Sequence, residues 1–151
     1  MWLLVSPGNP LKPARGMAPF AERLASAAAV AAPPRILASD IEARLGERYT
    51  VRTLAKLRRR FPRCRFVLVL GADNLVQLPR WNGWLRIAAL APIAVLPRPG
   101  WTRRALAGRA AKRLRAARRP PGRVLAEGGW CLVPAREHAA SATAIRAARG
   151  A

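Results

Sequence analysis

The chain has 151 residues, of which 28 are Lys or Arg and 7 are Asp or Glu, so its formal net charge is +21. At 52% hydrophobic residues it is too apolar for a disordered polycation, and its length suits one compact domain. Two cysteines and one histidine exclude a disulfide framework, a Cys/His zinc site and any chemistry that needs two imidazoles from this chain. No run reaches the roughly 20 apolar residues of a membrane-spanning helix, and the first residues lack the basic start of a signal peptide. We therefore expect a cytoplasmic protein.

Apolar runs and helical periodicity alternate along the sequence. The apolar runs predict strands at 2–5, 35–41, 66–70, 93–96 and 130–133. The periodic segments predict helices at 17–32, 50–60, 84–90 and 103–123, and a last helix from about residue 141. Thr50 is the expected N-cap of the second helix, whose buried face carries Val51, Leu54 and Leu57. This alternation predicts an α/β three-layer sandwich with a mainly parallel sheet.

The basic residues concentrate in two stretches, 56–65 and 103–123. The second stretch alternates Arg and Lys with Ala and Leu, which predicts one helix with a broad cationic face. It contains no aromatic residues for base stacking and no recognisable RNA- or DNA-reading motif. We favour an arginine-rich surface over a nucleic-acid-binding module, which stays the alternative. In either case the charge favours anionic ligands such as nucleotides.

Polar and aromatic residues gather in the loops that follow the predicted strands. In parallel α/β folds, ligands bind at the carboxyl ends of the strands, so these loops are the candidate binding segments. They contain Asn9-Pro10-Leu11-Lys12, Gly71-Ala72-Asp73, Pro79-Arg80-Trp81, Arg98-Pro99-Gly100 and Ser141-Ala142-Thr143-Ala144-Ile145-Arg146. Tyr49-Thr50 adds a helix N-terminus, which attracts anions.

Taken in this order, the motifs resemble those of the nicotinate-nucleotide adenylyltransferases, and the resemblance runs along the whole chain. Each motif is weak alone, and their order and placement after strands make the set specific. The resemblance implies joining of nicotinate mononucleotide to the adenylyl group of ATP, with Mg²⁺ on the phosphates, to give deamido-NAD and pyrophosphate in NAD biosynthesis. The partners that it implies are small-molecule nucleotides, with nucleic acid unlikely and no membrane.

The resemblance also implies the site residues. Those for ATP are Gly71, Asp73, Ser141, Thr143 and Arg146. Those for nicotinate mononucleotide are Asn9, Lys12, Tyr49, Thr50, Trp81 and Arg98. Hydroxyls and free N–H groups at a helix start suit a triphosphate, and Trp81 would stack on the pyridine ring. Ordinary interpretations stay open: helix capping for Ser141 and Asp73, packing for Trp81, and solvated charges for Lys12 and Arg98.

The sequence departs from the family pattern in two places. Ala140 and Ala142 replace an Ile and a Ser before Thr143, and the Gly-Gly-x-Phe-x-Pro turn with its His-x-Gly-His pair is absent. The resemblance therefore implies a Rossmann-like single domain, 1–151, truncated at its N-terminus and lacking the first, central strand. We expect a misassigned start codon or a fragment rather than a degenerate relative, and no catalysis at the family's rate, so no catalytic residue is assigned.

Another nucleotidyltransferase, such as phosphopantetheine adenylyltransferase, is the nearest rival. Trp81 and Tyr49-Thr50 favour a pyridine ligand over a pantetheine. The oligomeric state and the preference between acid and amide mononucleotide stay open.

Overall fold

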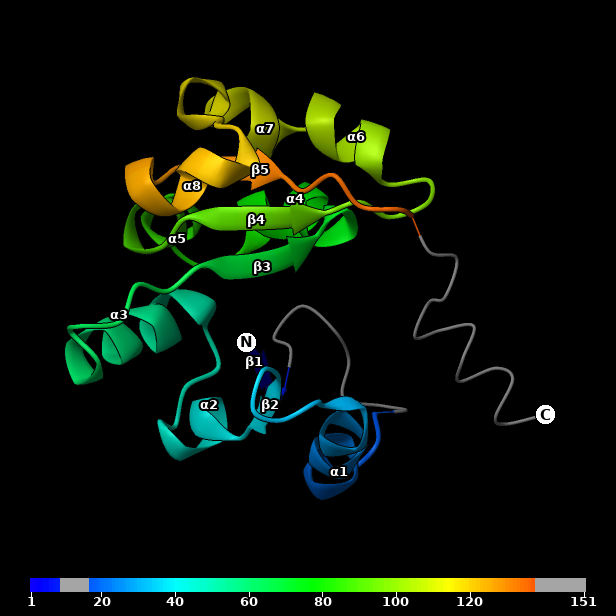
Figure 1. Ribbon diagram of the computed structural model, residues 1–151, viewed down its shortest axis with the longest axis vertical. Helices are drawn as coiled ribbons and strands as arrows, with labels where there is room; N and C mark the ends of the chain where they lie inside the picture. Colours follow the sequence, from blue (N-terminus) through cyan, green and yellow to red (C-terminus); the bar gives the residue numbers. More distant parts are fainter. Residues whose placement is uncertain (9–16, 138–151) are drawn as a thin grey trace. The chain divides into compact units, whose positions relative to one another are not determined.

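The computed structural model describes residues 1–8 and 17–137, and these divide between Arg63 and Cys64 into two compact units (Figure 1). Five of the predicted site residues lie outside the described residues: Asn9, Lys12, Ser141, Thr143 and Arg146.

The first unit is built on one parallel strand pair. Strand β1 (Trp2–Leu4) pairs with β2 (Leu37–Ser39), and α1 (Phe20–Val30) lies between them in the chain. α1 is shorter than the predicted helix 17–32, because Pro19 occupies its N-cap position and Pro33-Pro34 follows its end. The unit continues with α2 (Ile41–Arg44) and α3 (Thr50–Arg60).

Helix α3 buries Val51, Leu54 and Leu57, which confirms the face predicted from their spacing. The predicted N-cap is wrong by one residue: Tyr49 is the cap, with extended backbone, and Thr50 is the first helical residue. The predicted strand 35–41 is also too long. It ends at Ser39, whose hydroxyl accepts the N–H of Ile41 at 3.3 Å, and α2 starts there.

Two buried carboxylates join α2 and the turn after it to α3. Thr53 donates its hydroxyl to Glu42 Oε1 at 2.8 Å, and both side chains are buried. Lys56 Nζ lies 2.7 Å from Glu47 Oε1 and donates to the Leu45 carbonyl at 2.8 Å. Because buried acidic groups are stable only when they are paired, these contacts fix the loop that leads to Tyr49.

Thr53→Val is expected to lower the free energy of unfolding by about 1–3 kcal/mol, because it leaves the Glu42 carboxylate buried without its donor. Urea unfolding of the two proteins measures the difference. Thr53→Ser keeps the hydroxyl and should cost clearly less. An equal loss in both variants would show that the hydroxyl contributes no more than the methyl group and would contradict the prediction.

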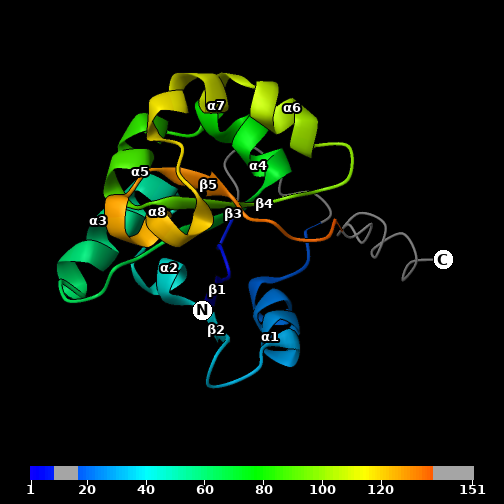
Figure 2. The ribbon, with the colours of Figure 1, turned by 45° about the horizontal axis from the view of Figure 1, so that its top comes forward.

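The second unit has a three-stranded parallel sheet in the order β3 (Leu68–Gly71), β4 (Ile93–Leu96) and β5 (Trp130–Leu132). Ile93 and Val95 of the central strand are fully buried. Helices α4 (Ala72–Gln77), α6 (Thr102–Ala107) and α7 (Arg109–Arg113) pack together on one face of the sheet (Figure 2). Helix α8 (Pro121–Glu127) covers β4 and β5 on the other face. The α/β class, the layering and the parallel strands are confirmed.

The strands of the two units form separate sheets. Within residues 1–8 and 17–137, β1 pairs with β2, β3 pairs with β4, and no pairing joins β1 to β3. These two parallel sheets do not conflict with the expected α/β fold. A single domain that lacks its central strand stays a prediction.

The predicted helix over 103–123 is wrong. The segment forms α6, α7, a 3₁₀ turn η2 (Arg115–Ala117) and the start of α8. Gly108 ends α6 and caps α7 with an extended backbone, and Pro120-Pro121 opens α8. Arg and Ala favour helix, but these breakers outweigh the propensity of their neighbours.

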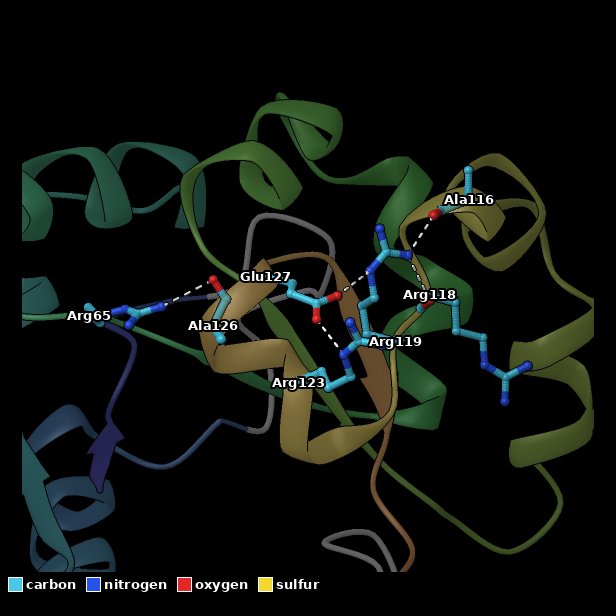
Figure 3. A network of polar contacts seen from close by, with 7 residues as sticks. All are labelled: Arg65, Ala116, Arg118, Arg119, Arg123, Ala126 and Glu127. Carbon is cyan, nitrogen blue, oxygen red and sulfur yellow. Dashed lines mark hydrogen bonds and ion pairs between the residues drawn. The ribbon is translucent and has the colours of Figure 1, made fainter.

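Several arginines of this segment are held by contacts within the second unit (Figure 3). Arg119 and Arg123 flank Glu127, with Arg119 Nε 3.2 Å from Glu127 Oε2. Arg119 also donates to the Ala116 carbonyl at 2.7 Å, and the Arg118 guanidinium lies 5.3 Å from the centre of the Trp130 ring. The single cationic helix face on which the nucleic-acid alternative depended is therefore not formed.

Cys131 is a buried free thiol on β5. Burial raises its pKa above the ordinary value, and a hydrogen bond with the Val95 backbone acts in the opposite direction. Because the folded state holds the thiol proton more tightly than the unfolded state, stability is expected to fall as the pH rises above roughly 8.5. Urea unfolding between neutral and alkaline pH measures the slope of the free energy of unfolding against pH. Cys131→Ala should reduce it, whereas Cys64→Ala, at an exposed position, should not; equal slopes in all three proteins would contradict the prediction.

Candidate functional site

Three of the predicted site residues meet at the carboxyl ends of β3 and β4. Gly71 ends β3, Asp73 lies in the first turn of α4, and Arg98 follows β4. Arg98 Nε is 3.2 Å from Asp73 Oδ1. That oxygen is buried and accepts no hydrogen bond from the described residues, so the contact is a charge pair without hydrogen-bond geometry. The Asp73 side chain is 29% exposed, and its solvent-facing area therefore belongs to its other atoms.

Gly71 makes room for this charge pair. Its φ of −74° is ordinary for any residue, so backbone freedom does not explain the glycine. A Cβ at this position would lie 2.7 Å from Arg98 Nε and closer still to Asp73 Oδ1. The absence of a side chain lets the carboxylate and the guanidinium approach across the strand end.

The loops after β4 and β5 are tied together by Thr102, which the sequence analysis missed. Its hydroxyl accepts the Arg98 N–H at 3.0 Å and lies 2.6 Å from Glu137 Oε1. Gly100, with φ +74°, provides the left-handed backbone of the turn between Arg98 and Thr102. Glu137 was also missed, although it is one of only seven acidic residues and follows a strand by a few positions.

Trp81 belongs to the second unit and closes the 3₁₀ turn η1 (Leu78–Arg80), where its N–H donates to the Leu78 carbonyl at 2.9 Å. Leu78 is fully buried, whereas Trp81 is half-buried in the turn that leads to α5 (Trp84–Leu90). The described contacts of Trp81 do not include Asp73 or Arg98, and its role in stacking stays a prediction.

Tyr49 and Thr50 belong to the first unit, at the start of α3. The Tyr49 carbonyl accepts the N–H groups of Arg52 and Thr53, and the Arg52 guanidinium lies 5.7 Å from the Tyr49 ring centre. The free N–H groups of such a first turn form the positive end of the helix dipole, which suits a carboxylate.

The second unit thus presents a carboxylate, a guanidinium and a hydroxyl at one edge of a parallel sheet. This defines the class of α/β proteins whose ligands bind at the carboxyl ends of their strands. The part of the chain that the structure describes contains no group of three or more His, Cys, Asp or Glu side chains placed to hold a metal ion. None of its helices combines the length and apolar character needed to cross a membrane.

Comparison with known proteins identifies the family. No family model matches the sequence. The chain is 55% identical over 151 residues to a probable nicotinate-nucleotide adenylyltransferase of Gluconobacter oxydans, covering 97% of the chain and 77% of that protein. It is 51% identical to the protein of the same description from Gluconacetobacter diazotrophicus, covering 97% and 71%, and 47% identical to one from Cereibacter sphaeroides, covering 97% and 80%. The chain belongs to the nicotinate-nucleotide adenylyltransferase family, which confirms the resemblance found in its motifs.

Proposed function

We propose that this protein transfers the adenylyl group of ATP to nicotinate mononucleotide, giving deamido-NAD and pyrophosphate. The observation that carries the proposal is the 55% identity, over 97% of the chain, to a relative described as a probable nicotinate-nucleotide adenylyltransferase. The comparisons give no support to the alternative phosphopantetheine adenylyltransferase or to a nucleic-acid-binding module.

In this reaction a phosphate oxygen of the mononucleotide attacks the α-phosphorus of ATP. The bond from that phosphorus to the β-phosphate oxygen breaks, and pyrophosphate leaves with the bonding electrons. No covalent enzyme intermediate is needed, so the protein contributes by positioning the two nucleotides and stabilising the charge that moves onto the leaving group.

The contacts in the second unit support a role for Asp73 at the ATP ribose. Its buried oxygen faces Arg98, which fixes the carboxylate, while the exposed part of the side chain is free to accept a ribose hydroxyl. The remaining assignments are proposals from the family motifs. For ATP they are Gly71, Ser141, Thr143 and Arg146, and for nicotinate mononucleotide Asn9, Lys12, Tyr49, Thr50, Trp81 and Arg98.

Mg²⁺ is proposed to enter with ATP. The ion usually keeps several waters and is bound by substrate phosphates with one or two carboxylates, so the proposal requires no protein cage. A partly exposed carboxylate such as Asp73 fits that donor set. Because ATP is a cytoplasmic substrate, the proposed reaction carries the further expectation of a cytoplasmic protein.

Binding and turnover test the proposal separately, because this sequence has one histidine and lacks the paired histidines that the family motif implies. Calorimetric titration should show saturable binding of nicotinate mononucleotide and of ATP with Mg²⁺, and no binding of phosphopantetheine. Chromatography should detect deamido-NAD at a rate below that of a relative that has the paired histidines. Preferential binding of phosphopantetheine, or binding of neither nucleotide, would contradict the proposal.

Trp81→Ala is expected to weaken the binding of nicotinate mononucleotide by roughly two- to tenfold, the effect of losing one ring-stacking contact. Trp81→Phe should keep most of the affinity, and the affinity for ATP should not change. The control is Trp101→Ala, which removes an exposed tryptophan whose ring lies near Arg104. Equal weakening by the Trp101 and Trp81 substitutions would contradict a stacking role for Trp81.

A further inference from the structure

The first unit contains a basic pocket at the ends of α2 and α3. Its volume is about 430 Å³, and it is lined by Arg44, Leu45, Lys56, Arg59 and Arg60. Pockets that bind small molecules generally occupy about 300–1,000 Å³, so this one is large enough for a small ligand. Four of the five lining residues are cationic and none is acidic.

The positive charge of this pocket is only partly neutralised. Lys56 is paired with Glu47 at 2.7 Å, but Arg44 lies 3.9 Å from Asp40 and is 75% exposed, so that pair is weak. Arg59 and Arg60 are exposed and form no ion pair among the residues that the structure describes. At least two guanidinium groups therefore face the pocket without a counter-charge.

Stabilisation of the α3 dipole accounts for cations in the last turn of that helix. Arg44 lies in the last turn of the four-residue helix α2 and brings a further cation from a second element to the same pocket. Like charges that converge from two helices repel one another, and a bound anion relieves that repulsion. Guanidinium groups match phosphate oxygens in a two-point fork, and the single apolar lining residue, Leu45, offers little to an apolar molecule.

We propose that this pocket binds a small polyphosphate anion, two or three linked phosphoryl groups, either free or carried on a nucleotide. The site does not depend on the proposed adenylyl transfer, because none of its lining residues belongs to the set assigned to ATP or nicotinate mononucleotide. Lys56 is held in place by Glu47 and the Leu45 carbonyl and supplies a fixed positive charge. The guanidinium groups of Arg59 and Arg60 bind the phosphate oxygens.

The test uses sodium tripolyphosphate, ATP and adenosine as probes of the whole chain, with amide NMR to locate binding and calorimetry to measure it. Tripolyphosphate should shift the amide signals of residues 44–47 and 56–60, and adenosine should not. Arg59→Ala/Arg60→Ala should weaken tripolyphosphate binding at least about tenfold.

The control variant Arg35→Ala/Arg63→Ala removes the same charge from exposed positions of the first unit and should leave the affinity nearly unchanged. ATP shifts at the same amides would assign the pocket to nucleotide phosphates as well, and their absence would restrict it to the free anion.

Three results would overturn the proposal: no shifts at these amides, equal weakening by both double variants, or displacement of tripolyphosphate by single-stranded RNA at lower concentration. The last result would identify a nucleic-acid surface. Arg59→Lys/Arg60→Lys keeps the positive charges at the end of α3 but removes the guanidinium groups that can bind phosphate at two points. This variant is used if Arg59→Ala/Arg60→Ala does not fold. The lysine variant should weaken tripolyphosphate binding about threefold or more. An unchanged affinity would show that the two guanidinium groups do not contact the phosphates.

Discussion

Gly71→Ala is expected to weaken ATP binding at least about tenfold without unfolding the protein. The new Cβ would lie 2.7 Å from Arg98 Nε and closer to Asp73 Oδ1, so the charge pair must separate. Because φ at this position is −74°, alanine brings no backbone strain, and the change acts on the site rather than on the strand. Calorimetry with ATP measures the loss, and thermal unfolding shows that the fold is kept.

Two further variants show whether Gly71 acts through Asp73. Asp73→Asn removes the charge and should itself weaken ATP binding. If both residues act through one contact, the double variant should lose hardly more affinity than the weaker-binding of the two single variants. Gly122→Ala is the matched control, since a Cβ there would meet no atom within 4 Å. Additive losses, or an equal loss at Gly122, would contradict this account of the site.

The elements that sequence reasoning predicted best are those with a strong local signal. The strand Ile93–Leu96 was placed at its observed bounds, because a short β-branched apolar run between breakers has few other solutions. The buried face of α3 followed from the spacing of Val51, Leu54 and Leu57. Where two local signals conflicted, the prediction failed. Most residues of the Ala- and Arg-rich segment 103–123 have high helix propensity, but Gly108 and Pro120-Pro121 interrupt the helix.

The site was predictable as a set of segments but not as a set of contacts. The motifs located Gly71, Asp73 and Arg98 separately. Their meeting depends on the parallel register that pairs Gly71 with Leu96 and so brings the two strand ends together. The contact between Thr102 and Glu137 joins residues 35 positions apart and has no local signature. Such long-range contacts follow from topology, which propensity and spacing do not encode.

Trp130→Ala is expected to lower the free energy of unfolding by about 3–5 kcal/mol, the range typical of a large aromatic side chain removed from a core. The side chain is 2% exposed in the core of the second unit. Its indole Nε1 donates to the Leu114 carbonyl at 2.9 Å, and β5 pairs it with Ile93. Alanine would leave a cavity and would remove one of the two hydrogen bonds that the Leu114 carbonyl accepts, the other coming from the Ala117 N–H. Urea unfolding followed by circular dichroism measures the change.

Three comparisons separate the contributions of this tryptophan. Trp130→Phe keeps most of the apolar volume and loses the indole hydrogen bond, so it should cost less than Trp130→Ala by at least about 1 kcal/mol. Arg118→Ala removes the cation above the ring, at 5.3 Å, and should cost about 0.5–1 kcal/mol in the wild type and nothing further once Trp130 is alanine. Trp101→Ala, at a 37% exposed position, should change stability by less than about 1 kcal/mol. If Trp101→Ala and Trp130→Ala lower the free energy of unfolding equally, burial does not determine the loss. That result would contradict the position of Trp130 in the core of the second unit.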